Sequence, residues 1–344
     1  MRLFAPCIIE NTANCLPFPW HPSVLCVDEL FGGHRFWMAQ TPLPPFEIQP
    51  YIDRYELPCI HYSDDGLEWK AIPANPIEDL TDEQVEEHDY FSDPHLVSKD
   101  GVLECYYRLT LLKDRQLVGS KTLLCKRTTT DGFNWSERMV VADLRRPGDL
   151  EIWGEQIISP ALIWEGGKYK CWYVDASGYK HGRHVRVVET ADGATWSPNR
   201  ICTLDGGNTD PWHIDVQCYD GRHYMIVYDY YKLSLYVSDD GGSRFEYVND
   251  ILQPSNNAYD FYSDGLYRAC SIKTENEFRV YFSARRKAKT YIGCLRTIDW
   301  KNFKGQNGQS FVRFMKKDIL ADMPRKEMLR PMKRRIKKAL GMVK

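Results

Sequence analysis

The chain has 344 residues, of which 43% are hydrophobic and 27% are charged, and it contains 10 Trp, 21 Tyr, 23 Gly and 19 Pro. These values exclude a disordered or collagen-like chain, and the many aromatic residues, glycines and prolines favour strands and tight turns over an all-helical fold. The formal net charge is -2, but residues 324–344 alone carry +8, so the remaining chain is acidic. An acidic body repels nucleic acid, and we therefore expect no nucleic-acid partner.

Two further features of the composition bear on the location of the protein. No run of about 18 apolar residues is present, so we expect neither a membrane-spanning helix nor a signal peptide, and we predict a cytoplasmic protein. The 11 cysteines are scattered without a C-x-x-C pair. This distribution predicts reduced thiols, and it predicts neither a disulfide framework nor a zinc site.

A short phrase containing an Asp-Gly turn recurs along the chain. Its clearest copies are residues 63–69, 129–135 and 190–196, while residues 238–245 are a weaker copy and residues 297–300 a fifth. Asp-Gly forms tight hairpin turns because both residues tolerate a positive φ, so each copy marks the last hairpin of a small sheet. The turn aspartates are 48 to 66 residues apart, which suits four short antiparallel strands and their connections.

Two more strands precede each turn, in the same order five times. The nearer strands are expected at residues 36–39, 103–108, 169–174, 224–228 and 278–283. The earlier ones open at residues 21–24, 93–96, 159–162, 213–216 and 267–270. Five such units predict an all-β fold, a five-bladed β-propeller over residues 1–310. We expect a strand from the N-terminal segment to pair into the last blade and close the ring.

The segment after the propeller, residues 311–344, reads as a separate basic amphipathic tail. Within residues 324–344, Met328, Met332 and Ile336 recur at helical spacing among nine Lys or Arg. This pattern predicts a short basic C-terminal helix that binds an anionic membrane surface or a protein partner. The cytoplasmic protein would then be associated with a membrane.

With this blade pattern and these strand-opening X-Pro dipeptides, the chain resembles the five-bladed β-propeller glycosidases, the arabinanase, β-xylosidase and invertase/levansucrase superfamily. The likeness covers roughly residues 20–300. Members of that superfamily place an Asp base in the first blade, a second Asp that positions the acid, and a Glu general acid in a later blade. We expect that no cofactor is required. The resemblance allows a calcium ion in the central channel, where His21, His213 and Asp215 would surround the ion or its waters; carboxylate and water would be the main ligands, because imidazole is a poor direct ligand for calcium.

The first strand of each propeller blade lines the channel, so its opening residues point into the funnel where ligands bind. Glycosidic cleavage needs one carboxyl group held protonated and another held ionised. The predicted catalytic carboxyls are Asp93, Glu155 and Asp215. His21 stands where the resembled family has its base, and an imidazole can act as acid or base near neutrality. The alternatives are a turn cap for Asp93, a solvated rim charge for Glu155 and a structural hydrogen-bond donor for His21.

A second group of residues is predicted to bind the substrate. Arg108 and Arg268 suit an anionic sugar, because a guanidinium group binds carboxylates and phosphates with two donors. Trp20 and Trp212 adjoin the strand-opening histidines and can stack on sugar rings. The remaining predicted substrate-binding residues are Glu56, His213 and Tyr267.

These observations predict a carbohydrate-active propeller with two functional interpretations. The first is a glycoside hydrolase or transglycosylase that acts on an oligo- or polysaccharide through its funnel carboxylates. The second is a non-hydrolytic protein for glycan binding or surface-polysaccharide assembly at the inner membrane face. The polar funnel residues favour the enzyme, whereas the missing first-blade Asp and the basic tail favour the second interpretation.

Overall fold

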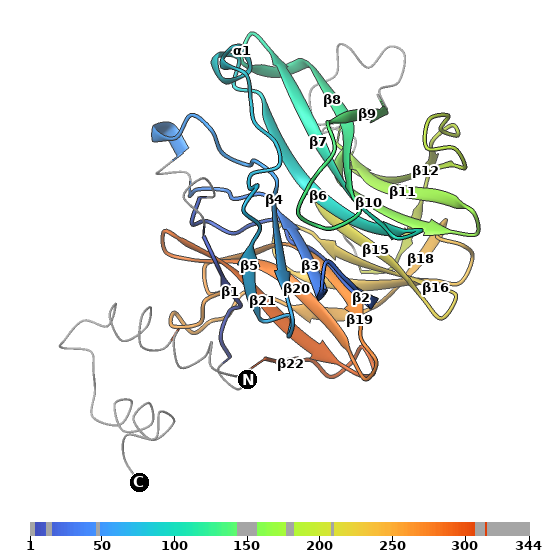
Figure 1. Ribbon diagram of the computed structural model, residues 1–344. Coiled ribbons are helices and arrows are strands. Elements are labelled where there is room, and N and C mark those ends of the chain that lie inside the picture. The colour runs from blue at the N-terminus through green and yellow to red at the C-terminus, as the bar shows by residue number, and fades with distance from the viewer. Residues whose placement is uncertain are drawn as a thin grey trace, which may run out of the picture.

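The computed structural model describes residues 4–11, 16–45, 49–142, 157–176, 182–207, 210–306 and 314. The strands in these ranges form five sheets of four or five strands each (Figure 1). The innermost strand of every sheet contacts the innermost strands of the two neighbouring sheets, so the five form a closed ring. The predicted five-bladed β-propeller is therefore confirmed. The proposed basic tail lies outside the described residues except for Phe314.

The blades follow one another in chain order, each running from the channel outward. Blade 1 contains β2 (Ser23–Phe31), β3 (His34–Gln40), β4 (Cys59–Ser63) and β5 (Glu68–Ala71). Blade 2 contains β6 (Tyr90–Lys99), β7 (Val102–Lys113), β8 (Gln116–Thr129) and β9 (Met139–Ala142). Blade 3 contains β10 (Ile158–Glu165), β11 (Lys168–Asp175), β12 (His184–Thr190) and β13 (Arg200–Ile201).

Blades 4 and 5 complete the ring. Blade 4 contains β15 (His213–Tyr219), β16 (Arg222–Tyr228), β17 (Leu233–Ser238) and β18 (Arg244–Leu252), with β14 (Thr203–Asp205) parallel to β18 at the outer edge. Blade 5 contains β19 (Gly265–Lys273), β20 (Phe278–Arg286), β21 (Lys289–Thr297) and β22 (Lys304–Gly305).

The repeated turn joins the third and fourth strands of every blade, as the sequence predicts. In blade 1 the Ser63 hydroxyl donates to Asp65 Oδ1 at 3.0 Å and accepts from the Gly66 amide at 2.9 Å. Hydroxyl-to-carboxylate bonds with the same spacing occur at the other four turns. In the fifth, Trp300 takes the place of glycine with a φ of +58°. The hydroxyl and the Asp two residues later therefore define the turn.

The turn glycines also seal neighbouring blades against one another. Trp37 of β3 is fully buried, and a Cβ atom added to Gly132 of blade 2 would lie 2.1 Å from its ring. Blades 5 and 1 also meet at a turn glycine. Tyr281 of β20 donates its hydroxyl hydrogen to the Gly66 carbonyl at 3.0 Å, and a Cβ atom added to Gly66 would lie 2.6 Å from the Tyr281 hydroxyl. Side chains larger than hydrogen at these positions would push the blades apart.

The N-terminal strand β1 (Ile8–Ile9) corrects one expectation. It pairs parallel with β5 at the outer edge of blade 1, and not with a strand of the last blade. The segment still touches the last blade, because the Cys7 amide donates to the Ile292 carbonyl of β21 at 2.8 Å. The chain therefore bridges blades 1 and 5, while the ring itself is closed by the side-chain contacts between them.

Helices contribute little to the described structure. Besides the 3-10 turn η1 (Gln49–Tyr51), there is one short helix, α1 (Asp82–Glu86). It begins after Thr81, whose hydroxyl accepts from the Gln84 amide at 3.2 Å while Gln84 Oε1 accepts from the Thr81 amide at 3.0 Å. This reciprocal pair is a capping box. Within the described ranges no helix is long and apolar enough to cross a bilayer.

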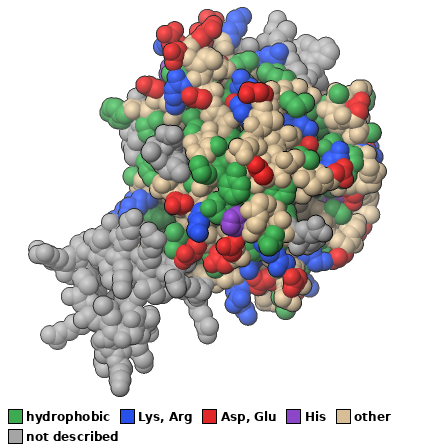
Figure 2. Space-filling view, viewed as in Figure 1, with side chains coloured by type: hydrophobic (Ala, Val, Ile, Leu, Met, Phe, Trp, Pro, Cys, Tyr) green, Lys and Arg blue, Asp and Glu red, His purple; other side chains and the backbone are tan. Residues whose placement is uncertain are grey.

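The charges on the surface and the state of the cysteines are two further features of the described structure. On the face in Figure 2, acidic and basic side chains are interspersed, with apolar side chains scattered between them. This face therefore has no broad region of one charge sign among the residues described. None of the ten cysteines in the described ranges forms a disulfide.

Candidate functional site

Three inner strands open with the same unusual backbone conformation. His21, Asp93 and Ser159 each precede a proline, and their φ angles are +51°, +52° and +54°. A left-handed backbone is rare in residues other than glycine and is usually maintained by the surrounding structure at a functional site. It brings the three residues together here: the Ser159 amide donates to Asp93 Oδ2 at 3.1 Å, and His21 Nε2 lies 3.9 Å from Asp93 Oδ1.

Asp93 is the centre of this cluster and is fully buried. Its Oδ2 lies 2.8 Å from Arg108 Nε, while its Oδ1 lies 3.4 Å from His213 Nδ1 and 3.7 Å from Arg268 Nη1. Burial alone would raise the pKa of Asp93, but the neighbouring Arg108, followed by the histidines and Arg268, holds it well below its usual range. Asp93 is therefore an ionised carboxylate in the protein interior.

The two histidines beside Asp93 are neutral at physiological pH. Burial lowers the pKa of His21 to about 3, and it lowers the pKa of His213 well below the usual value. His21 Nδ1 lies 2.7 Å from Thr41 Oγ1 and 3.5 Å from Glu56 Oε1. These contacts orient the ring so that Nε2 faces Asp93. A neutral imidazole whose other nitrogen is hydrogen-bonded is the form that binds metal ions.

His21, Asp93 and His213 can be tested as a metal site by their geometry. Each offers one ligand atom, and these atoms lie within 4.8 Å of one another. Metal–ligand bonds of about 2.0–2.2 Å place the donors of a tetrahedral site roughly 3.3–3.6 Å apart. Asp93 Oδ1 lies 3.4 Å from His213 Nδ1 and 3.9 Å from His21 Nε2, so a small contraction would seat an ion. All three atoms are buried without a hydrogen-bond partner among the described residues. The donor set therefore fits a divalent transition metal.

This arrangement differs from the calcium ligands suggested by the resemblance. Asp93, and not Asp215, joins the two histidines. Imidazole is a poor ligand for calcium and a good one for zinc and related ions. The residues at the centre of the funnel therefore do not fit calcium.

Asp215 lies on the same face of β15 as His213, but its described contacts are with Ser271, Gln217 and His95 and not with the metal-ligand cluster. Its Oδ2 accepts from the Ser271 amide at 3.0 Å, and its Oδ1 lies 3.5 Å from Gln217 Nε2 and 3.8 Å from His95 Nδ1. Burial raises the pKa of Asp215 to about 6. Asp215 is therefore a buried carboxyl group between inner strands, and it does not belong to the cluster of His21, Asp93 and His213.

Arg268 supplies donors to the interior of the funnel. Its side chain is fully buried, and no nitrogen of its guanidinium group has a hydrogen-bond partner within the described ranges. Arg268 Nη1 forms an ion pair with Asp93 Oδ1 at 3.7 Å. Buried donors of this kind are costly unless a ligand or water satisfies them.

Aromatic side chains pack together beside the polar cluster. The Trp20 ring stacks on Tyr267 with centroids 5.3 Å apart, and the His213 ring lies 4.3 Å from that of Tyr267. Trp212 donates its indole hydrogen to the Tyr267 hydroxyl at 2.9 Å and stacks on Tyr230 at 5.0 Å. We call Trp20, Tyr267, Trp212 and Tyr230 the aromatic wall. Trp20 is buried, whereas Trp212 and Tyr267 are partly exposed and Tyr230 is exposed. Exposed aromatic rings next to a polar cluster suit a sugar ring.

The structure thus brings together most of the predicted site residues. Those that meet at the funnel are His21, Asp93, His213, Glu56, Arg108, Arg268, Trp20, Trp212 and Tyr267. Glu155 lies outside the described residues. The sequence reasoning missed Thr41 and Tyr230, together with Arg183, whose guanidinium lies 4.9 Å from the Trp212 ring centroid. All three follow or connect strands, where no repeat pattern distinguishes them.

Comparison with known proteins gives the following relatives. No family model matches the chain. An A type blood N-acetyl-α-D-galactosamine deacetylase from Flavonifractor plautii is 24% identical over 337 residues, which cover 82% of this chain and 42% of the deacetylase. This chain therefore spans less than half the length of that protein.

Solved structures agree on the fold. A crystal structure of an N-acetylgalactosamine deacetylase from F. plautii, in complex with blood group B trisaccharide, superposes with a TM-score of 0.64 at 19% identity, covering 91% of this chain and 96% of that one. A xylan β-1,4-xylosidase from Bacillus halodurans C-125 gives a TM-score of 0.59 at 15% identity, covering 86% and 57% of the two chains. The predicted likeness to the five-bladed propeller glycosidases is thus confirmed at the level of the fold.

Proposed function

We propose that this protein is a carbohydrate-active hydrolase that removes the acyl group from an N-acylated sugar, using a divalent transition metal held by His21, Asp93 and His213. The observation that carries the proposal is the convergence of two neutral imidazoles and one ionised carboxylate, with donor atoms unsatisfied, where propeller glycosidases have their aspartate base. Similarity to the N-acetylgalactosamine deacetylase along 82% of the chain supports the same reaction class.

Each neighbouring residue has a role in this reaction. A divalent ion, when bound, would polarise the amide carbonyl and lower the pKa of a bound water. Arg108 keeps Asp93 ionised, and Thr41 and Glu56 orient the His21 ring. The unsatisfied donors of Arg268 are available to an oxygen atom of the substrate. The aromatic wall provides the surface on which the sugar ring packs.

Glycoside hydrolysis is the second candidate, favoured by one observation. The pKa of Asp93 is held low, while burial raises that of Asp215 to about 6. Glycosidases usually have two catalytic carboxyl groups, one with a low pKa and one with a raised pKa. We rank this function second because the described contacts of both Asp215 oxygens lie within the inner strands.

The experiment separates the two reactions on one substrate. The full-length protein is incubated with p-nitrophenyl N-acetyl-α-D-galactosaminide and with N-acetylated oligosaccharides, and the release of acetate and of nitrophenol is measured. Deacetylation should require zinc, manganese or cobalt after treatment with a chelator. Asp93→Asn and His213→Gln should each lower kcat/KM by at least about 100-fold, because each removes a metal ligand.

His34→Gln is the matched control, because His34 is partly exposed and pairs with Asp64 at 2.8 Å outside the funnel. It should retain the parent activity. Nitrophenol without acetate would instead support glycoside hydrolysis. Sugar binding with neither product would support the non-hydrolytic interpretation.

A further inference from the structure

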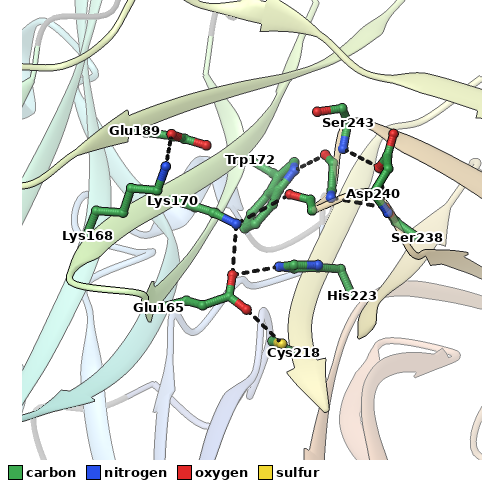
Figure 3. Close-up of polar contacts among 12 residues, drawn as sticks. Glu165, Lys168, Lys170, Trp172, Glu189, Cys218, His223, Ser238, Asp240 and Ser243 are labelled. Carbon is green, nitrogen blue, oxygen red and sulfur yellow. Dashed lines mark hydrogen bonds and ion pairs between the residues drawn. The ribbon is translucent and has the colours of Figure 1, made fainter. Parts of the chain in front are cut away.

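A second cluster of metal-ligating side chains lies at the junction of blades 3 and 4. Figure 3 shows Glu165 at the end of β10, Cys218 near the end of β15 and His223 near the start of β16, with their polar groups directed toward one another. Along β15, Cys218 is five residues beyond His213, or about 16 Å at the rise of an extended strand. The cluster therefore belongs to the opposite ends of the strands from the funnel.

The donor atoms of this cluster are in direct contact. Glu165 Oε1 accepts from Cys218 Sγ at 3.1 Å, and Glu165 Oε2 lies 3.0 Å from His223 Nε2. The His223 side chain is only 3% exposed, whereas that of Glu165 is 32% exposed. The cluster thus has a buried side that fixes its geometry and a partly open side through which an ion can enter.

We propose that Glu165, Cys218 and His223 form a binding site for a divalent cation of the zinc class. Bonds of about 2.0–2.3 Å from zinc to oxygen, nitrogen and sulfur place tetrahedral donors roughly 3.3–3.5 Å apart. The two distances from Glu165 need only a small expansion to reach this range, and one donor atom from each of the three residues lies within 4.8 Å of the others. A thiolate, an imidazole and a carboxylate form a borderline-soft set that favours zinc over calcium or magnesium. An ion bound here would connect blade 3 to blade 4.

The three residues come from three strands, which is why the spacing of the cysteines gives no sign of the site. Zinc motifs that are visible in a sequence place ligands two to four residues apart on one turn. Here Glu165 is 53 residues from Cys218 along the chain. Only the packing of blade 3 against blade 4 makes them neighbours.

Lys170 of β11 competes with the ion. Its Nζ lies 2.8 Å from Glu165 Oε2 and 3.5 Å from the carbonyl oxygen of Gly241. It neutralises the carboxylate when no ion is bound, and the Gly241 carbonyl remains as its partner when the ion takes Glu165. Removal of this cation should therefore strengthen ion binding.

Ion binding here must release a proton. The charged groups around the Cys218 thiol and its partner Glu165 are Lys170 from β11 and His223 from β16, and Asp240 from the turn after β17 acts on His223. Burial, followed by the bond to Glu165, raises the pKa of Cys218 to about 11, so the thiol is protonated near neutrality. The S–H bond breaks, a sulfur–metal bond forms, and the proton passes to solvent.

Cobalt titration of the full-length protein tests the site, because a cobalt–thiolate bond gives a charge-transfer absorption in the near ultraviolet. The funnel residues His21, Asp93 and His213 include no sulfur, so cobalt bound there gives no such band. This readout is therefore independent of the proposed function. The parent protein should show the band, and Cys218→Ser should abolish it. His223→Gln should weaken cobalt binding at least about tenfold.

Two further variants complete the test. Cys26→Ser is the matched control, because Cys26 is a partly exposed cysteine of β2 in blade 1, away from blades 3 and 4, and it should keep the band. Lys170→Met should bind cobalt more tightly than the parent. The proposal is overturned if the band is absent from both the parent and Lys170→Met at mildly alkaline pH. It is equally overturned if the band persists in Cys218→Ser or if His223→Gln binds cobalt as tightly as the parent.

Discussion

Replacing Asp215 by Asn is expected to stabilise the protein relative to the parent as the pH rises. The carboxyl group is fully buried, and burial raises its pKa from 3.8 to about 6. The folded protein therefore holds this proton more tightly than the unfolded chain. The stabilisation from the protonated group is fully present below pH 3.8 and is lost as the pH rises through about 6.

The magnitude follows from the size of the shift. About two pKa units at about 1.4 kcal/mol each amount to about 3 kcal/mol of unfolding free energy. About 2 kcal/mol of this should be lost between about pH 4.5 and pH 7.5. The introduced amide would not titrate, while its oxygen can still accept from the Ser271 amide. The variant should therefore gain about 2 kcal/mol on the parent over this range.

Urea unfolding followed by tryptophan fluorescence measures this difference at the two pH values. Asp64→Asn, which removes a carboxyl group that is 76% exposed, serves as the surface control. The reasoning is refuted if the free-energy difference between Asp215→Asn and the parent is the same at both pH values. A difference that changes in the opposite direction would show that Asp215 is stabilised in its ionised form.

Three other predictions concern the core, the funnel and the tail. Gly132→Ala should lower the unfolding free energy by about 2–4 kcal/mol, because the added Cβ would collide with Trp37 of the neighbouring blade. Gly101 has a similar φ but open space around it, so Gly101→Ala should lower the unfolding free energy by only about 1–2 kcal/mol in the same urea assay. Arg108→Met should cost about 3–5 kcal/mol in metal-free protein because it leaves Asp93 buried with less compensating charge, and added zinc should restore part of the loss. Truncation after Asp322 should abolish co-sedimentation with anionic liposomes at low salt, and failure of the full-length protein to bind them would favour a protein partner for the tail.

The blade count follows from local sequence because the information for each turn lies within a few residues. A hydroxyl residue, an Asp two positions later and the following amides complete their hydrogen bonds without help from the rest of the fold. For this reason even the fifth turn, with Trp300 in place of glycine, is recognisable from Thr297 and Asp299. Strand order within each blade follows from the same punctuation, and so do the residues that open the inner strands.

The sequence by itself thus determined the five blades and the residues that face the channel, because both depend on short-range turns and on strand alternation. Only the tertiary structure decided that Asp93, and not Asp215, meets His21 and His213, because the depth of a side chain in the funnel depends on the left-handed openings, the bulges and the stagger between blades. The same applies to Glu165 and its cysteine and histidine partners, which become neighbours only when two blades pack. Contacts between distant strands depend on the packing of the whole ring, and no short segment of the chain encodes that packing alone.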